Sequence, residues 1–150
     1  MPQIQSLLTG RPVLTLREQS TALDAACEME RNRVGAILVT DERGRPRGIF
    51  TERDLMVRVV VGGRDPATVR LADVMTHELY TSPPDRKVAE VRRELQERHI
   101  RHVPVVRNDE VIGVLSLRDL LRADLERAAH ELDETRRYIQ GEGGDLPPSS

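Results

Sequence analysis

The residues of this chain best suited to chemistry stand in one motif that occurs twice. Each copy has a glycine, two apolar residues, a hydroxyl residue, two further residues and an aspartate. The copies run from Gly48 to Asp54 and from Gly113 to Asp119. In each copy the hydroxyl and the aspartate have the spacing of a capping box, in which both side chains bind the free N–H groups at a helix start. A helix cap is the simplest interpretation of either copy taken alone.

The same motif could also hold a nucleotide. A helix start carries spare N–H groups and the positive end of the helix dipole, so it can accept an anion. A nearby carboxylate can accept two hydrogen bonds from a ribose diol. The glycine lets backbone approach closely, and the apolar residues of the strand could cover a base. The hydroxyl and carboxylate groups of the motif are therefore candidate ligand contacts.

The sequence shows no pattern typical of a metal site or of a catalytic nucleophile. The four histidines lack the spacing of metal ligands, and with a single cysteine they predict no metal site. The chain has no P-loop and no signature of a serine or cysteine nucleophile, so we expect no catalysis. Cys27 falls on the apolar side of a predicted helix, and we expect it to be buried.

Each motif ends a longer pattern that predicts strand, helix, strand, strand and helix. In the first half these are residues 13–16, 21–32, 37–40 and 47–54 with the helix that follows; in the second they are 79–81, 88–95, 103–106 and 111–119 with its helix. Two repeats of this size would be marginal apart, so we expect a shared core. Short helical lead-ins at 4–8 and 71–75 are each expected to belong to the repeat that follows.

The duplicated pattern resembles the CBS-domain pair, also called the Bateman module, over roughly residues 3–125. The resemblance implies an α+β fold of tandem CBS repeats, as β-α-β-β-α units packed about a pseudo-two-fold axis, here with a C-terminal helical extension. We expect repeat 1 at 1–66 and repeat 2 at 67–125, together forming one globular module. A helical extension at 126–140 and a flexible tail at 141–150 would follow.

The resemblance also implies two clefts between the repeats, which in many family members bind AMP, ATP, other adenosine compounds or NAD(H). The matching residues are Thr51 and Ser116 for a ribose or phosphate, Asp54 and Asp119 for the ribose, Arg101 and His102 for phosphates, and Gly35 and Ala36 at the equivalent positions of repeat 1. The remaining candidate site residues are Ile37, Val103, Pro104, Arg53 and Arg118.

The family pattern implies that each aspartate works with the residue pair before the first central strand of the other repeat. Asp54 and Thr51 would then face Arg101 and His102, while Asp119 and Ser116 would face Gly35 and Ala36. Leu38 stands where the second repeat has Pro104. We therefore expect unequal clefts, with phosphates held better beside Arg101.

The last helix can extend far past the repeat. Its apolar stripe consists of Leu121, Leu125, Ala128, Leu132, Thr135 and Ile139, at alternating spacings of four and three. Such a stripe is expected to contact a partner in a homodimer, or alternatively to lie back on its own domain.

Composition narrows the list of partners. The formal net charge is −2 and acidic and basic residues are interleaved, which gives no electrostatic footprint for nucleic acid. No apolar run approaches the ~20 residues that span a bilayer, and the N-terminus has no features of a secretory signal, so we expect a cytoplasmic protein.

The sequence thus predicts a regulatory, non-catalytic module that senses adenine nucleotides as a homodimer and acts on an unidentified protein partner. It would need no cofactor besides the regulatory ligand. The alternative is a ligand-free structural or stress-linked interaction dimer.

Overall fold

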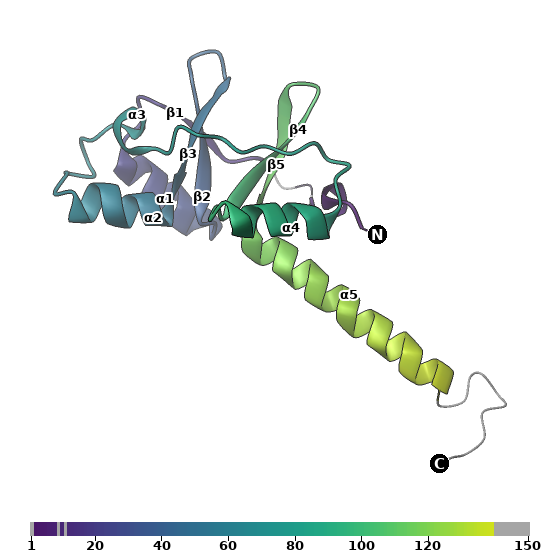
Figure 1. The fold of residues 1–150 in the computed structure, drawn as a ribbon. Helices are drawn as coiled ribbons and strands as arrows, with labels where there is room; N and C mark the ends of the chain where they lie inside the picture. The colour runs from purple at the N-terminus through teal and green to yellow at the C-terminus, as the bar shows by residue number, and fades with distance from the viewer. Residues whose placement is uncertain (1, 9, 11, 140–150) are drawn as a thin grey trace.

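The computed structural model describes residues 2–8, 10 and 12–139, and it places two similar repeats side by side, with a long helix leaving the second one (Figure 1). The first repeat contains β1 (Thr15–Arg17), α1 (Ala22–Asn32), β2 (Ala36–Thr40), β3 (Pro46–Thr51), α2 (Glu52–Asp54) and its continuation η2 (Leu55–Val61). The second contains α4 (Val88–Glu97), β4 (His102–Arg107), β5 (Glu110–Ser116) and α5 (Leu117–Arg137). The predicted α+β fold with a C-terminal helical extension is confirmed.

The two repeats differ in their sheets. In the first, β1 runs parallel to β2, and β2 pairs antiparallel with β3. In the second, β4 and β5 form an antiparallel pair. The strand predicted at 79–81 is absent from this described segment, where only Ser82 bridges β4. Pro83 and Pro84 follow at once, and proline has no N–H with which to extend a ladder.

Capping boxes start three of the helices, including the two motif helices for which the sequence predicts them. Thr21 caps α1 through Asp24, Thr51 caps α2 through Asp54, and Ser116 caps α5 through Asp119. In each box the hydroxyl accepts from the aspartate N–H, and the carboxylate accepts from the N–H of the capping residue. Both motif helices therefore begin where their strands end, at β3 and β5.

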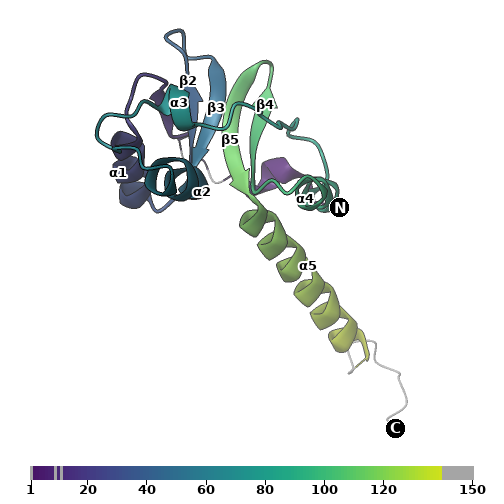
Figure 2. The ribbon, with the colours of Figure 1, turned by 60° about the vertical axis from the view of Figure 1, so that its left-hand side comes forward.

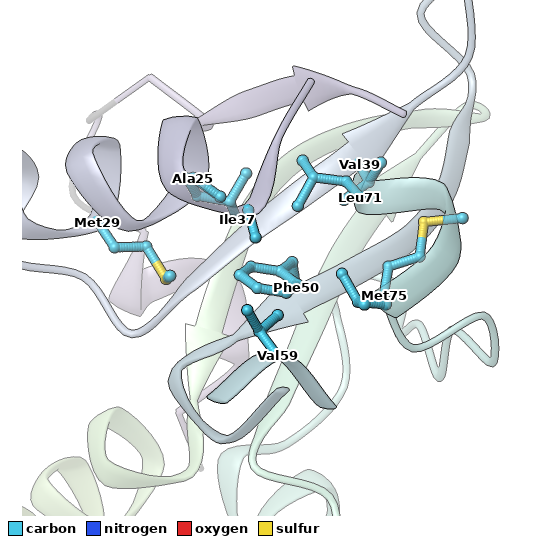
Figure 3. Packing of buried hydrophobic residues seen from close by; sticks show 10 residues of the cluster. Ala25, Met29, Ile37, Val39, Phe50, Val59, Leu71 and Met75 are labelled. Carbon is cyan, nitrogen blue, oxygen red and sulfur yellow. The ribbon is translucent and has the colours of Figure 1, made fainter. Parts of the chain in front are cut away.

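Each repeat has its own apolar core, so the expected shared core is wrong, and each core takes in the lead-in of the other repeat. Around Phe50 of the first core lie Leu71 and Met75, which come from α3 (Leu71–Val74) and the residue after it (Figure 3). The second core takes in Ile4 of η1 (Ile4–Leu7). The expectation that each lead-in belongs to the following repeat is therefore wrong. The boundaries of the two repeats, at 1–66 and 67–125, stay a prediction.

The motif glycines make room for these exchanged lead-ins. A Cβ on Gly48 would lie 2.5 Å from the carbonyl oxygen of Thr76, which pairs with Ile49 as an extra antiparallel bridge. A Cβ on Gly113 would lie 2.4 Å from Cδ2 of Leu8. In both repeats, the space beside the motif glycine is thus filled by a lead-in segment of this chain, at Thr76 or at Leu8.

The last helix departs from the body of the protein. Its first turns pack on α4 and bury Leu120, and its distal half projects away from both repeats (Figures 1 and 2). The alternative that the whole stripe lies back on its own domain is therefore wrong for this distal half. The tail predicted at 141–150 lies outside the described residues.

Cys27 is exposed, so the expectation that it is buried is wrong; the buried face of α1 is made by Ala22, Ala25 and Met29.

Among the helices that the structure describes, none combines the length and the apolar character that crossing a bilayer would require.

Candidate functional site

The carboxylate of the first motif is held on all sides by its own chain. Asp54 is only 7% exposed, and its Oδ2 accepts from the N–H of Thr51 at 3.0 Å and from the hydroxyl of Thr51 at 3.1 Å. The hydroxyl of Thr76 lies 3.1 and 3.2 Å from its two oxygens, and Nε of Arg58 lies 3.6 Å from Oδ1. A ligand that binds Asp54 must share or displace the contact with Thr76.

The second motif has the same cap with fewer contacts. Asp119 is half-buried, and its Oδ2 accepts from the N–H of Ser116 at 2.8 Å. The N–H of Asp119 donates to the hydroxyl of Ser116 at 3.0 Å. Within residues 12–139 no donor reaches its Oδ1, so this oxygen can accept a hydrogen bond from a ligand.

Strand pairing sets each predicted pre-strand pair beside the motif of its own repeat. In the first repeat Ala36 pairs with Thr51, and the N–H of Glu52 donates to the carbonyl of Gly35 at 3.1 Å. In the second repeat His102 pairs with Ser116, and the N–H of Leu117 donates to the carbonyl of Arg101 at 2.7 Å. The positions carried over from the family pattern thus lie at the ends of neighbouring strands.

The side chain of His102, from the second repeat, lies against the first repeat. A Cβ built on Gly35 would lie 3.7 Å from Nε2 of His102 and 3.5 Å from the carboxylate of Glu52. The imidazole therefore reaches from the start of β4 to the start of α2, on the other repeat. This junction is where a ligand could contact both motifs at once.

The charge of His102 is set by this position. Burial lowers the pKa of His102 below its usual value of 6.5, because removing the imidazole from water penalises its charged form. The carboxylates of Asp119, Glu52 and Asp54 act in the opposite direction, and Arg101 acts with burial. Without an anionic ligand the imidazole is therefore held toward its neutral form.

The other predicted site residues divide into two groups. Arg53, Arg101 and Arg118 are exposed, so their guanidinium groups are available to phosphates. Ile37, Val103 and Pro104 are buried, and the first two belong to the two cores. They position the strand ends that carry the polar residues.

Sequence reasoning missed two polar residues of the junction. Glu52 occupies a variable position of the motif, and only its acidic character at a helix start, where the second repeat has Leu117, could have drawn attention to it. Thr76 directly follows the second lead-in, and its contact with Asp54 depends on the exchange of lead-ins, which the local sequence does not reveal.

The junction is suited to binding rather than to metal chemistry. It offers carboxylate acceptors on Glu52 and Asp119, a ring N–H on His102 and exposed guanidinium groups nearby. Across the described residues, no group of three or more histidine, cysteine or acidic side chains could hold a metal ion. Hydroxyl and phosphate groups are the ligand chemistry that these side chains match.

Comparison with protein families gives one match, found twice. The CBS domain matches residues 6–61 and residues 71–126. These two segments contain the two copies of the motif.

Two curated relatives are similar over most of this chain. The mitochondrial CBS domain-containing protein CBSX3 of Arabidopsis thaliana is 35% identical over 81% of this chain and 61% of its own length. The CBS domain-containing protein YhcV of Bacillus subtilis is 31% identical over 80% of this chain and 84% of its own length. The chain thus spans less than two thirds of the plant relative and most of the bacterial one.

A solved structure agrees with the fold. A CBS domain protein from Pyrobaculum aerophilum, complexed with AMP, is 31% identical and superposes with a TM-score of 0.74. The match covers 86% of this chain and 99% of that protein.

Proposed function

This chain belongs to the CBS-domain family, with two domains in tandem, and we propose that it is a regulatory, non-catalytic module that binds an adenine nucleotide between its repeats. The observation that carries the proposal is the meeting of both motifs at His102, which reaches from the second repeat to Gly35 and Glu52 of the first. The AMP complex of the Pyrobaculum aerophilum relative supports the choice of ligand class.

The predicted pairing gives each cleft a different character. Asp54 and Thr51 would act with Arg101 and His102, so this cleft offers charge to phosphates but must loosen Thr76 from the carboxylate. The other cleft would combine Asp119 and Ser116 with Gly35 and Ala36. It offers the open Oδ1 of Asp119 and no cation from the pre-strand pair, so we expect phosphates to bind there less tightly.

Regulation would follow from where the ligand sits. A nucleotide at the junction contacts both repeats, so it favours arrangements of the repeats in which both sets of contacts are made. An arrangement that a partner protein also distinguishes then couples nucleotide binding to partner binding. We propose that the chain does this in the cytoplasm as a homodimer. The exposed apolar residues Met56, Val57 and Val60 of η2, and Leu121 and Leu125 of α5, supply surface for association.

Thermal unfolding with added AMP, ATP, NAD or NADH tests the proposal. A ligand at about 100 times its dissociation constant stabilises the folded state by about 2.7 kcal/mol, which is a clear shift of the melting temperature. Calorimetry on Arg101→Ala then tests the pairing, since this change should remove the tighter of two binding events. Loss of the weaker event alone would mean that the pairing is reversed.

The alternative, a ligand-free structural dimer, is favoured by one observation. Asp54 is nearly buried and already saturated by Thr51, Thr76 and Arg58, as a purely structural cap would be. Mass spectrometry of small molecules that remain bound through purification distinguishes the two functions. An adenosine compound supports the sensor, and an empty protein that also fails to bind added nucleotides supports the structural dimer.

A further inference from the structure

The distal half of α5 carries an apolar stripe that nothing in the described chain covers. Leu125 and Leu132 of α5, and Ile139 two residues after its end, are 71%, 54% and 59% exposed. Figures 1 and 2 show this part of α5 projecting from the second repeat with no other element beside it. The stripe is therefore surface that is available to another molecule.

A helix in this position needs a partner for its stability. An isolated helix shorter than about 12–15 residues is marginal in water, and most helical stability in proteins comes from packing of an apolar face. Arg92 of α4 pairs with Asp124 of α5, and Arg127 is the last half-buried residue of α5. Residues 128–139 extend beyond that point, and all of them are exposed.

The spacing of the stripe is that of a two-stranded coiled coil. Leu121, Ala128 and Thr135 occupy d positions, and Leu125, Leu132 and Ile139 occupy a positions. The flanking e positions are then Arg122, Ala129 and Arg136, and the flanking g positions are Asp124, Glu131 and Tyr138. One flank is thus basic and the other largely acidic.

We propose that the α5 stripe pairs in parallel with the same stripe of a second copy of this chain. In a parallel pair each g residue faces the e residue five positions later on the other helix, so Glu131 of one copy meets Arg136 of the other, twice by symmetry. Arg136 makes no ion pair among residues 12–139, whereas its neighbour Arg137 pairs with Asp133 at 3.6 Å. Glu131, which contacts Arg127 at 3.2 Å, is 62% exposed at its side chain and accessible to a second cation.

An antiparallel pair is disfavoured by the same charges. The register that aligns all six stripe positions sets Leu121 opposite Ile139 and brings e beside e and g beside g. Arg122 would then face Arg136, and the two copies of Glu131 would face each other. Like charges in such positions destabilise the pair.

A membrane surface fits the helix less well. Helices that lie on anionic bilayers are rich in lysine and arginine on their polar face. Residues 121–139 contain four arginines and five carboxylates, so this segment carries no excess of positive charge. Both signs are interspersed, as on the outer faces of coiled coils.

The inference deepens the homodimer of the proposed function and does not depend on nucleotide binding. If ligand binding fails while pairing is found, the sensor function is wrong and the interface stands. If pairing fails while ligand binding is normal, only the interface is wrong.

Charge reversal tests the orientation by sedimentation equilibrium of the full chain. Arg136→Glu should weaken the dimer by about tenfold, since two attractive exposed pairs become repulsive. Glu131→Arg should do the same, and the double variant should restore the wild-type dissociation constant. Asp133→Arg, on the outer face, is the matched control and should leave that constant unchanged. A tighter dimer with Arg136→Glu, or no change in either single variant, would overturn the proposal.

Cysteine trapping supplies a second readout. In a Cys27→Ser background, Thr135→Cys places thiols at the same level of a parallel pair, where oxidised glutathione should drive a disulfide-linked dimer. His130→Cys, on the opposite face, should give little. In the antiparallel register the two copies of residue 135 lie ten residues apart along the axis, about 15 Å. Absence of linked dimer with Thr135→Cys, or equal yields at both positions, would contradict parallel pairing.

Discussion

The imidazole of His102 lies between the two repeats and interacts with carboxylates of both. It is packed near Gly35 and Glu52, and burial holds its pKa below 6.5. In the unfolded chain the same group has its ordinary pKa, so below pH 6.5 the unfolded state binds more protons than the folded state. Folding stability should therefore decrease as the pH falls through this range.

This pH dependence can be measured by thermal unfolding. We expect the melting temperature of the wild type to fall between pH 7.5 and pH 5.5 by more than that of His102→Gln, which lacks the titrating group. The other histidines are common to both proteins and cancel in the comparison. Equal losses in the two proteins would show that His102 has its ordinary pKa in the folded state.

Nucleotide binding should act on the same group in the opposite direction. A phosphate near His102 stabilises the imidazolium, so the bound complex has a higher pKa than the free protein and takes up protons on binding. The affinity for AMP should therefore rise as the pH is lowered from 8 to 6. A pH-independent affinity in calorimetry would place the phosphate away from His102.

The two motif carboxylates should differ in their structural cost. Asp119→Ala removes a cap and should cost about 1 kcal/mol of unfolding free energy. Asp54→Ala also strands the hydroxyl of Thr76 in a partly buried position, and should cost about 2–3 kcal/mol. Each variant should lose more than tenfold in nucleotide affinity at its own cleft, Asp54→Ala in the tighter binding event and Asp119→Ala in the weaker one.

The matched control is Asp24→Ala, which removes the exposed capping box of α1. It should cost about 1 kcal/mol of stability and leave nucleotide affinity unchanged. If Asp54→Ala and Asp119→Ala behave like this control, the motif carboxylates are helix caps and nothing more.

At the residue scale, the part of the site that could be predicted is the part that local spacing determines. Thr51 with Asp54 and Ser116 with Asp119 form caps because the partners are three residues apart on one helix start. Glu52 and Thr76 could not be found in this way, because their neighbours in the site come from the other repeat or from a lead-in far along the chain.

At the scale of elements, the exchanged lead-ins decide how glycine substitutions act. A Cβ on Gly48 would meet the backbone oxygen of Thr76, which cannot move without breaking its bridge to Ile49. A Cβ on Gly113 would meet only the end of the Leu8 side chain, which can rotate away. The first contact is rigid and the second is not.

Gly48→Ala should therefore destabilise the protein by about 2–3 kcal/mol, and Gly113→Ala by less than about 1 kcal/mol. Adding Leu8→Ala should make Gly113→Ala harmless relative to Leu8→Ala alone, and should not rescue Gly48→Ala. Urea unfolding of the five variants measures these differences. Similar losses for both glycine variants would mean that the lead-ins do not pack as observed.

Most strands and helices could be predicted from sequence because their apolar residues recur at clear periods. The central strands and the helices that follow the motifs are examples. The partner of each lead-in could not be predicted, since η1 and α3 have similar apolar patterns, and the local pattern does not reveal that η1 packs into the core of the second repeat and α3 into that of the first. The missing strand at 79–81 shows the opposite effect, in which two local prolines override an apolar pattern.

At the scale of the whole molecule, the proposed ligand and the proposed dimer act at different places. The ligand would bind at the junction of the repeats, and the second copy along the projecting α5 (Figure 2). The junction combines groups from both repeats, so a ligand there stabilises the module as one unit rather than one repeat alone. Nucleotide should therefore shift a single unfolding transition.

Titration calorimetry of AMP into the protein tests the central claim most directly. We predict saturable binding whose tighter event weakens more than tenfold in Asp54→Ala and is retained in Asp24→Ala. An absence of binding heat for AMP at several temperatures, with ATP, NAD and NADH equally silent, would contradict the claim that this CBS-domain pair is an adenine-nucleotide sensor.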